Sequence, residues 1–231
     1  MNPYAIRDKI IIYCNPSINK LSNFYDIINK QYLSLNSYEV SFKDKYYELP
    51  NTESRIEIPS NIVPFDSPAC FLSLKLNPTS DNRNCIMQIP GNVTLLYYTS
   101  TKEFHMLTKY GQVSSRALTE EEFSNKINIY IDFINCKFCI NTYDLYSYPT
   151  YESWALDGGK NIRIGRGNWR TYFNTGFNLY EFGFLNNILN EQEVKFLFTC
   201  ESNMLKSSIK NIILNNKLFR EHCIPYDDKE E

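Results

Sequence analysis

One short segment of the sequence contains most of the residue types that bind ligands or partners. It covers residues 166–172, and Trp154 and Asp157 precede it. Tyr, Trp and Arg dominate binding energy at interfaces, and the flat face of an aromatic ring can stack on a sugar. The candidate binding residues are therefore Trp154, Asp157, Arg166, Asn168, Trp169, Arg170 and Tyr172. The alternative is that Trp169 only plugs one end of the fold.

The acidic residues lack the spacing of a two-carboxylate glycosidase. Retaining glycosidases hold two acids close together, and a strand motif of the form Glu-x-Asp-x-x-Glu does not occur here. Residues 120–122 are three consecutive glutamates, which we expect to form a solvated acidic loop. Asp132 has no second carboxylate close to it in the sequence. We therefore predict a protein that is not an enzyme, with glycoside hydrolysis as the least favoured alternative.

The cysteines and histidines do not predict a metal or redox centre. Cys136 and Cys139 have C-x-x-C spacing, but a zinc ribbon needs a second pair, and a redox pair needs the start of a helix. We expect both to be buried or half-buried thiols of a β-hairpin. The histidines, His105 and His222, are too few and too far apart for a histidine-based metal site. No metal or cofactor is therefore expected.

Composition indicates a globular protein whose charges nearly cancel, which leaves a local basic patch as the open alternative. The 24 basic and 26 acidic side chains leave a formal charge of −2, so no global field attracts nucleic acid. The sequence lacks a secretory signal and the roughly 20 consecutive apolar residues that span a bilayer. Seven cysteines, an odd number, are typical of reduced thiols inside a cell. We expect an intracellular, cytoplasmic protein.

The elements that must position these residues are short β-strands. Apolar residues alternate with polar ones through residues 38–185, a pattern typical of an all-β sandwich. In the run 69–76, Cys70, Leu72, Leu74 and Leu76 share one face, which should line the core. Residues 135–137 are the expected tip of a hairpin. The predicted strands are 46–49, 55–58, 69–76, 85–89, 94–98, 104–107, 126–133, 138–145, 161–165 and 177–185.

Helical spacing is concentrated near the end of the sequence. Asn190 is the expected N-cap of a short helix, and Glu193 stands at the third position of a capping box. Val194, Leu197 and Phe198 would then pack inward. A second, C-terminal helix is predicted over residues 204–222. Residues 24–32 fit either a helix or an irregular packed arm.

The order of these elements resembles the concanavalin A-like lectin and glucanase superfamily, in particular its laminin-G-like jelly-roll domains. The resemblance lies in residues 47–59, 69–78 and 127–141, and above all in 161–165 with 173–194, where a strand ending in Gly165 precedes the closing strand and a short helix. It covers residues 37–198 and implies a two-sheet antiparallel jelly-roll sandwich. The glycine usual in the family after Asn141 is absent.

The sequence therefore predicts a single domain over residues 1–231. Residues 1–36 form an N-terminal arm, 37–198 the jelly-roll core, and 199–231 a C-terminal helical extension and tail. Our leading hypothesis is a non-enzymatic intracellular binding or scaffold protein that contacts a protein partner. The alternative is a carbohydrate-binding, lectin-like module.

Overall fold

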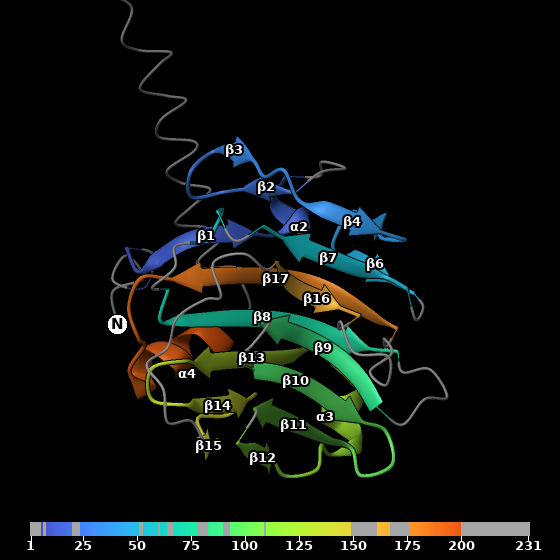
Figure 1. The fold of residues 1–231 in the computed structure, drawn as a ribbon, viewed down its shortest axis with the longest axis vertical. Helices are drawn as coiled ribbons and strands as arrows, with labels where there is room; N and C mark the ends of the chain where they lie inside the picture. The colour runs from blue at the N-terminus through green and yellow to red at the C-terminus, as the bar shows by residue number, and fades with distance from the viewer. Residues whose placement is uncertain are drawn as a thin grey trace, which may run out of the picture.

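The chain forms a β-sandwich of two antiparallel sheets (Figure 1). This confirms the predicted all-β, two-sheet architecture. The computed structural model describes residues 6, 8–19, 24–50, 53–59, 61–63, 67–77, 83–89, 93–108, 110–148, 161–166 and 176–199.

The larger sheet has ten strands among the described residues. Its main path runs β15, β14, β13, β8, β17, β1, β2 and β3, while β6 pairs with β17, and β5 with β6. The bounds are β1 Ile10–Cys14, β2 Tyr25–Asp26, β3 Gln31–Tyr32, β5 Ser41–Phe42, β6 Tyr47–Leu49, β8 Ala69–Leu76, β13 Ile127–Asp132, β14 Lys137–Ile140, β15 Tyr146–Ser147 and β17 Phe177–Leu185.

The smaller sheet has seven strands in the described part of the chain, in the order β12, β11, β10, β9, β16, β7 and β4. The bounds are β4 Asn36–Tyr38, β7 Arg55–Ile58, β9 Arg83–Ile89, β10 Val93–Tyr98, β11 Glu103–Thr108, β12 Gly111–Ser114 and β16 Ile162–Gly165. Both sheets combine residues that are distant in sequence, as when β16 lies between β9 and β7.

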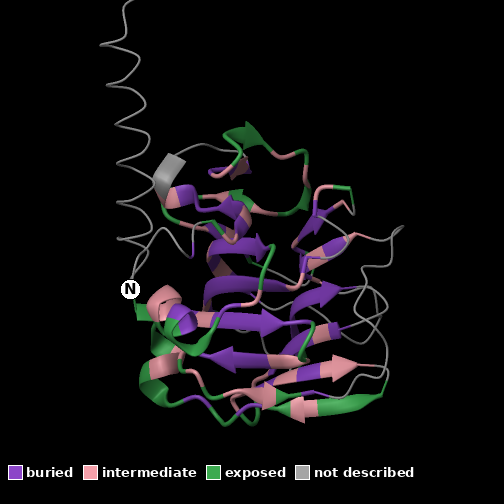
Figure 2. Cartoon of the chain, turned by 90° about the vertical axis from the view of Figure 1, so that its left-hand side faces the viewer, coloured by how far each residue is buried: buried purple, intermediate pink, exposed green. Residues whose placement is uncertain are grey.

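The main hydrophobic core lies between the two sheets. Every second residue of a strand points to the same face, so alternate apolar residues enter this core. In β8 the predicted face of Cys70, Leu72, Leu74 and Leu76 is buried in this core. Each fully buried side chain of this size contributes about 2 kcal/mol to folding. Figure 2 shows that burial extends through the central strands, whereas β3 and other edge segments are exposed.

A second apolar cluster covers the outer face of the larger sheet. It contains the other alternate residues, including Phe71 of β8, Tyr130 of β13 and Leu185 of β17. Helix α4 (Glu191–Thr199) contributes the fully buried Val194, and Leu197 and Phe198 pack beside it, as predicted. Burial on both faces explains why β8 is apolar at nearly every position.

The predicted capping box of α4 is present. The backbone N–H of Asn190 donates to the carboxylate of Glu193 over 2.8 Å, and the N–H of Glu193 donates to Asn190 Oδ1 over 3.0 Å. The Lys9 ammonium pairs with the same carboxylate at 2.7 Å, which ties α4 to the residues before β1. The short helix after the last strand is thus confirmed. The predicted C-terminal helix over 204–222 lies outside the described residues.

Several segments differ from the sequence-based expectations. Residues 24–32 form neither a helix nor an irregular arm, but the hairpin β2–β3. Residues 120–122 begin the short helix α3 (Glu120–Ser124) rather than a loop. The strand expected over 138–145 ends at Ile140, because Asn141 has a left-handed backbone with φ of 58°. The run Ile10–Cys14, for which no element was predicted, is strand β1 beside β17, and short helix α2 (Pro16–Asn19) follows it.

Candidate ligand-binding cleft

The described residues form a cleft lined partly by the β2–β3 hairpin. This hairpin lies at one end of the larger sheet (Figure 1). Its walls are strand β1, the β2–β3 hairpin and the turn that follows β7. Its volume is about 690 Å³, within the range of small-molecule sites, which is roughly 300–1,000 Å³. The hairpin is joined to β1 by the pairing of Cys14 with Asp26 and, at Ile11, by the side chain of Asn29.

Asp26 fixes the shape of the hairpin that forms one wall. Its side chain is fully buried, and Oδ1 accepts the backbone N–H groups of Tyr13 at 3.1 Å and Ile28 at 3.0 Å. The amide of Asn29 donates to Asp26 Oδ2 over 2.5 Å and to the Ile11 carbonyl over 2.8 Å. Charge-assisted bonds of this kind are stronger than neutral ones. The carboxylate therefore connects the turn to β1.

Tyr32 presents an aromatic ring at the cleft. It is one of the most exposed large hydrophobic residues described, with 57% of its surface accessible. Tyr25, its cross-strand partner, holds the ring edge-to-face at 5.2 Å and 77°. Such a contact restricts the ring at little entropic cost, because tyrosine has few rotatable bonds. Tyr32 is thus a braced, solvent-accessible platform.

The lining of the cleft combines amides and a hydroxyl with apolar side chains. Every described residue that lines it has an uncharged side chain. The apolar part comes mainly from residues 10–12, Ile28, Leu33, Pro59 and Ile62. The polar part comes from Asn29, Gln31, Ser34 and Asn61, all of them exposed. This arrangement can form hydrogen bonds with hydroxyl groups while the apolar surface contacts carbon–hydrogen faces.

The sequence-predicted site and this cleft are different places. Of its seven residues, Trp154, Asp157, Asn168, Trp169, Arg170 and Tyr172 lie outside the described residues. Arg166 is described: its N–H donates to the Ser54 carbonyl over 3.1 Å and its guanidinium pairs with Glu53. These partners precede β7, whereas the cleft contains the turn after β7, so Arg166 does not line it. The proposed role of the other six stays a prediction.

The carboxylate singled out from the sequence has a structural role. Asp132 is buried, and its oxygens accept the backbone N–H of Asn135 at 2.8 Å and that residue's amide at 2.7 Å. It therefore holds the β13–β14 hairpin turn together. The turn covers residues 133–136, so it shares Asn135 and Cys136 with the predicted tip 135–137, whereas Lys137 already belongs to β14. Cys136 has a left-handed conformation at φ 55°.

The buried carboxylate of Glu181 in β17 was missed in the sequence. Its Oε2 accepts the hydroxyl of Tyr13 at 2.5 Å and the amide of Asn15 at 2.9 Å, and Lys126 lies 3.2 Å from Oε1. Burial is the main cause that raises the pKa of Tyr13 well above its usual value, and the Glu181 charge adds to it. Both carboxylate oxygens are thus engaged, and the network connects β1 with β17.

The two hairpin cysteines are thiols in the structure. Cys139 is buried in β14, which raises its pKa to about 12, and Cys136 is half-buried at the turn with a raised pKa from the same cause. The described cysteines form no disulfide. Within the described ranges, no group of three or more His, Cys, Asp or Glu residues is placed to hold a metal ion.

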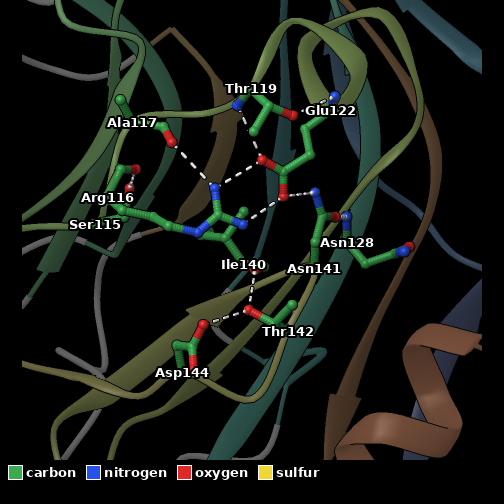
Figure 3. Close-up of polar contacts among 10 residues, drawn as sticks. All are labelled: Ser115, Arg116, Ala117, Thr119, Glu122, Asn128, Ile140, Asn141, Thr142 and Asp144. Carbon is green, nitrogen blue, oxygen red and sulfur yellow. Dashed lines mark hydrogen bonds and ion pairs between the residues drawn. The ribbon is translucent and has the colours of Figure 1, made fainter.

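Glu122, the last residue of the acidic run 120–122, anchors the connection from the smaller sheet to the larger one (Figure 3). Arg116 binds both oxygens of Glu122, at 2.7 and 2.6 Å, and Asn141 donates to the same carboxylate over 3.2 Å. The hydroxyl of Thr119 accepts the Glu122 N–H, and the Thr119 N–H donates back to Glu122, which completes a capping box. The Arg116 hydrogen bonds are the main cause that lowers the pKa of Glu122 to about 2.

Comparison with known proteins identifies the fold rather than a family. No protein-family model matches the chain, and no curated protein sequence does. A sialidase of Trypanosoma rangeli in complex with sialic acid matches with a TM-score of 0.64 and 11% identity, over 86% of this chain and 34% of that one. The binding domain of botulinum neurotoxin serotype D matches with a TM-score of 0.61 and 13% identity, over 84% of this chain and 52% of that domain's chain. The binding domain of botulinum neurotoxin serotype D/C VPI 5993 matches with a TM-score of 0.59 and 14% identity, over 84% of this chain and 53% of that domain's chain.

These matches correct one prediction. The sequence predicted a protein that is not an enzyme, and the finding that sialidases share its fold overturns that prediction. This chain spans about a third of the length of those sialidases and about half of the neurotoxin domains. Among the described residues, no helix is long and apolar enough to cross a membrane. The chain is thus an all-β sandwich of a fold that occurs in sialidases and in toxin binding domains.

Proposed function

We propose that the chain is a lectin-like sandwich of the concanavalin A type that binds carbohydrate in the cleft beside β1. The observation that carries the proposal is Tyr32, an exposed ring braced against Tyr25 at the edge of a neutral, amide-lined cleft. Sugar rings offer both polar hydroxyls and apolar carbon–hydrogen faces. A site for them therefore needs hydrogen-bonding side chains beside a flat apolar surface, and the cleft has both.

The fold is compatible with this proposal. Similar sandwiches occur in a sialidase determined with sialic acid and in the binding domains of two botulinum neurotoxin serotypes. Because a shared fold does not specify a function, the proposal depends on the cleft and not on the likeness. The role predicted from the sequence, that of an intracellular scaffold for a protein partner, stays a prediction.

A glycan array tests the proposal with three proteins. These are the wild type, Tyr32→Ala and the matched control Tyr110→Ala, which removes another exposed tyrosine, 39% accessible, at the β11–β12 turn. We expect the wild type and the control to bind a common set of glycans. Loss of the platform should weaken binding by Tyr32→Ala at least tenfold, which corresponds to about 1.4 kcal/mol.

Two outcomes contradict the proposal. One is an array to which the wild type does not bind. The other is binding that Tyr32→Ala retains at the wild-type level. Circular dichroism and thermal unfolding of each variant show that a loss of binding does not reflect a loss of fold, since both tyrosines are exposed and their removal leaves the core intact.

A further inference from the structure

The charge of the cleft specifies which glycans it can take. All of its described lining is uncharged, and the polar groups it offers are the amide oxygen of Asn29, the amides of Gln31 and Asn61 and the hydroxyls of Tyr32 and Ser34. Lys30, in the same hairpin turn, is exposed and does not belong to the lining. An anionic sugar that enters would lose hydration without gaining a described countercharge in the lining, which disfavours its binding.

A buried negative charge adds to this effect. Asp26 lies behind the hairpin turn with no exposed surface, and its carboxylate is linked to the cleft wall through Asn29. Its partners are the two backbone N–H groups and the Asn29 amide, all of them neutral. A charge that is shielded from solvent acts over a longer distance than an exposed one. The field of Asp26 therefore opposes a second negative charge in the cleft.

We propose that the cleft selects neutral sugars and discriminates against glycans that end in sialic acid. This inference rests on the proposed carbohydrate-binding function and specifies its ligand class. It separates the chain from the Trypanosoma rangeli sialidase, whose structure holds sialic acid, although the two share a fold.

The test uses pairs of glycans that differ only in a terminal sialic acid. Affinity for each member is measured by biolayer interferometry for the wild type and for Tyr32→Ala. We expect the neutral member of a pair to bind at least ten times more tightly than its sialylated form. Tyr32→Ala should lose binding to the neutral member.

A charge variant tests the cause of the discrimination. Asn61 is exposed in the turn after β7 and lines the cleft, so Asn61→Lys places a cation there without disturbing the core. This variant should reduce the preference for the neutral member at least threefold. The matched control Gln112→Lys adds the same charge to the exposed edge strand β12, outside the cleft lining, and should leave the preference unchanged.

The outcomes separate this inference from the proposed function. If sialylated glycans bind as tightly as neutral ones or more tightly, and Tyr32→Ala removes that binding, the site stands and the neutral selectivity is refuted. Equal effects of Asn61→Lys and Gln112→Lys also refute it, because the discrimination would not arise in the cleft. If neither member of any pair binds, the carbohydrate-binding function itself is refuted, and the selectivity falls with it.

Discussion

Glu122 provides a quantitative test of how the two sheets are joined. Its pKa is lowered from 4.5 to about 2, chiefly by the hydrogen bonds from Arg116. A shift of this size corresponds to about 3 kcal/mol of stability if it applies in full. The Arg116 side chain is 42% exposed, so solvent screening reduces the expected value to about 1 kcal/mol. Glu122→Gln should therefore destabilise the protein by about 1 kcal/mol at pH 7.

The pH dependence follows from the direction of the shift. Because the folded-state pKa lies below the unfolded one, the stabilisation is complete well above pH 4.5 and is lost as the pH falls through about 2. At pH 3 less than half of it should remain. Urea unfolding at pH 7 and pH 3 measures the difference between the wild type and Glu122→Gln at each pH.

The matched control is Glu121→Gln, which removes the same charge from an exposed position of the same helix. It should change the unfolding free energy by less than about 0.5 kcal/mol. The reasoning is refuted if the two variants are equally stable at pH 7. It is also refuted if the deficit of Glu122→Gln fails to narrow between pH 7 and pH 3.

Three further changes test other parts of the structure. Asp26→Asn replaces a carboxylate that accepts a hydrogen bond from the Asn29 amide. Urea unfolding should show a loss of about 1–3 kcal/mol in unfolding free energy, and the glycan array should show a loss of binding. Unchanged stability and binding would mean that the carboxylate does not shape the cleft. In Gly183→Ala the added Cβ would lie 2.5 Å from the Phe71 ring, and thermal unfolding should show a loss of about 1–3 kcal/mol; a neutral result would contradict this close packing. With N-ethylmaleimide at pH 8, Cys136 should react before Cys139 in the folded protein, because Cys139 is buried and its pKa is raised to about 12. Peptide mass spectrometry measures the order of modification. The reverse order would contradict the assignment of Cys139 to β14.

The long elements could be predicted because each contains its own signal. In β8, eight consecutive residues point alternately to the two faces of the sheet, so the residues that face the core could be predicted from the two-residue period alone. The capping box at Asn190 and Glu193 was also legible, because its reciprocal hydrogen bonds join residues three apart in sequence. The same rule applies to Thr119 and Glu122. There the polar run 120–122 favoured a loop, and the helix was missed.

The cleft could not be predicted because its parts are distant in sequence and its strands are very short. β2 and β3 have two residues each, too few to show any period, and β1 is apolar at every position. The turn after β7 meets them only through the fold. One local signal was present: Asp26 three residues before Asn29 is typical of a side-chain-stabilised turn, and it indicates a hairpin. The emphasis on tryptophan and arginine led instead to the segment near Arg166.

The most direct test of the central claim is an NMR titration of the ¹⁵N-labelled protein with the neutral glycan that binds most strongly on the array. If the cleft is the binding site, the largest amide shifts should belong to residues that line it, such as Gln31, Tyr32, Ser34 and Asn61. The same titration of Tyr32→Ala should show no saturable shifts. If the largest shifts fall instead on the residues around Arg166, with the cleft amides unchanged, the account is contradicted.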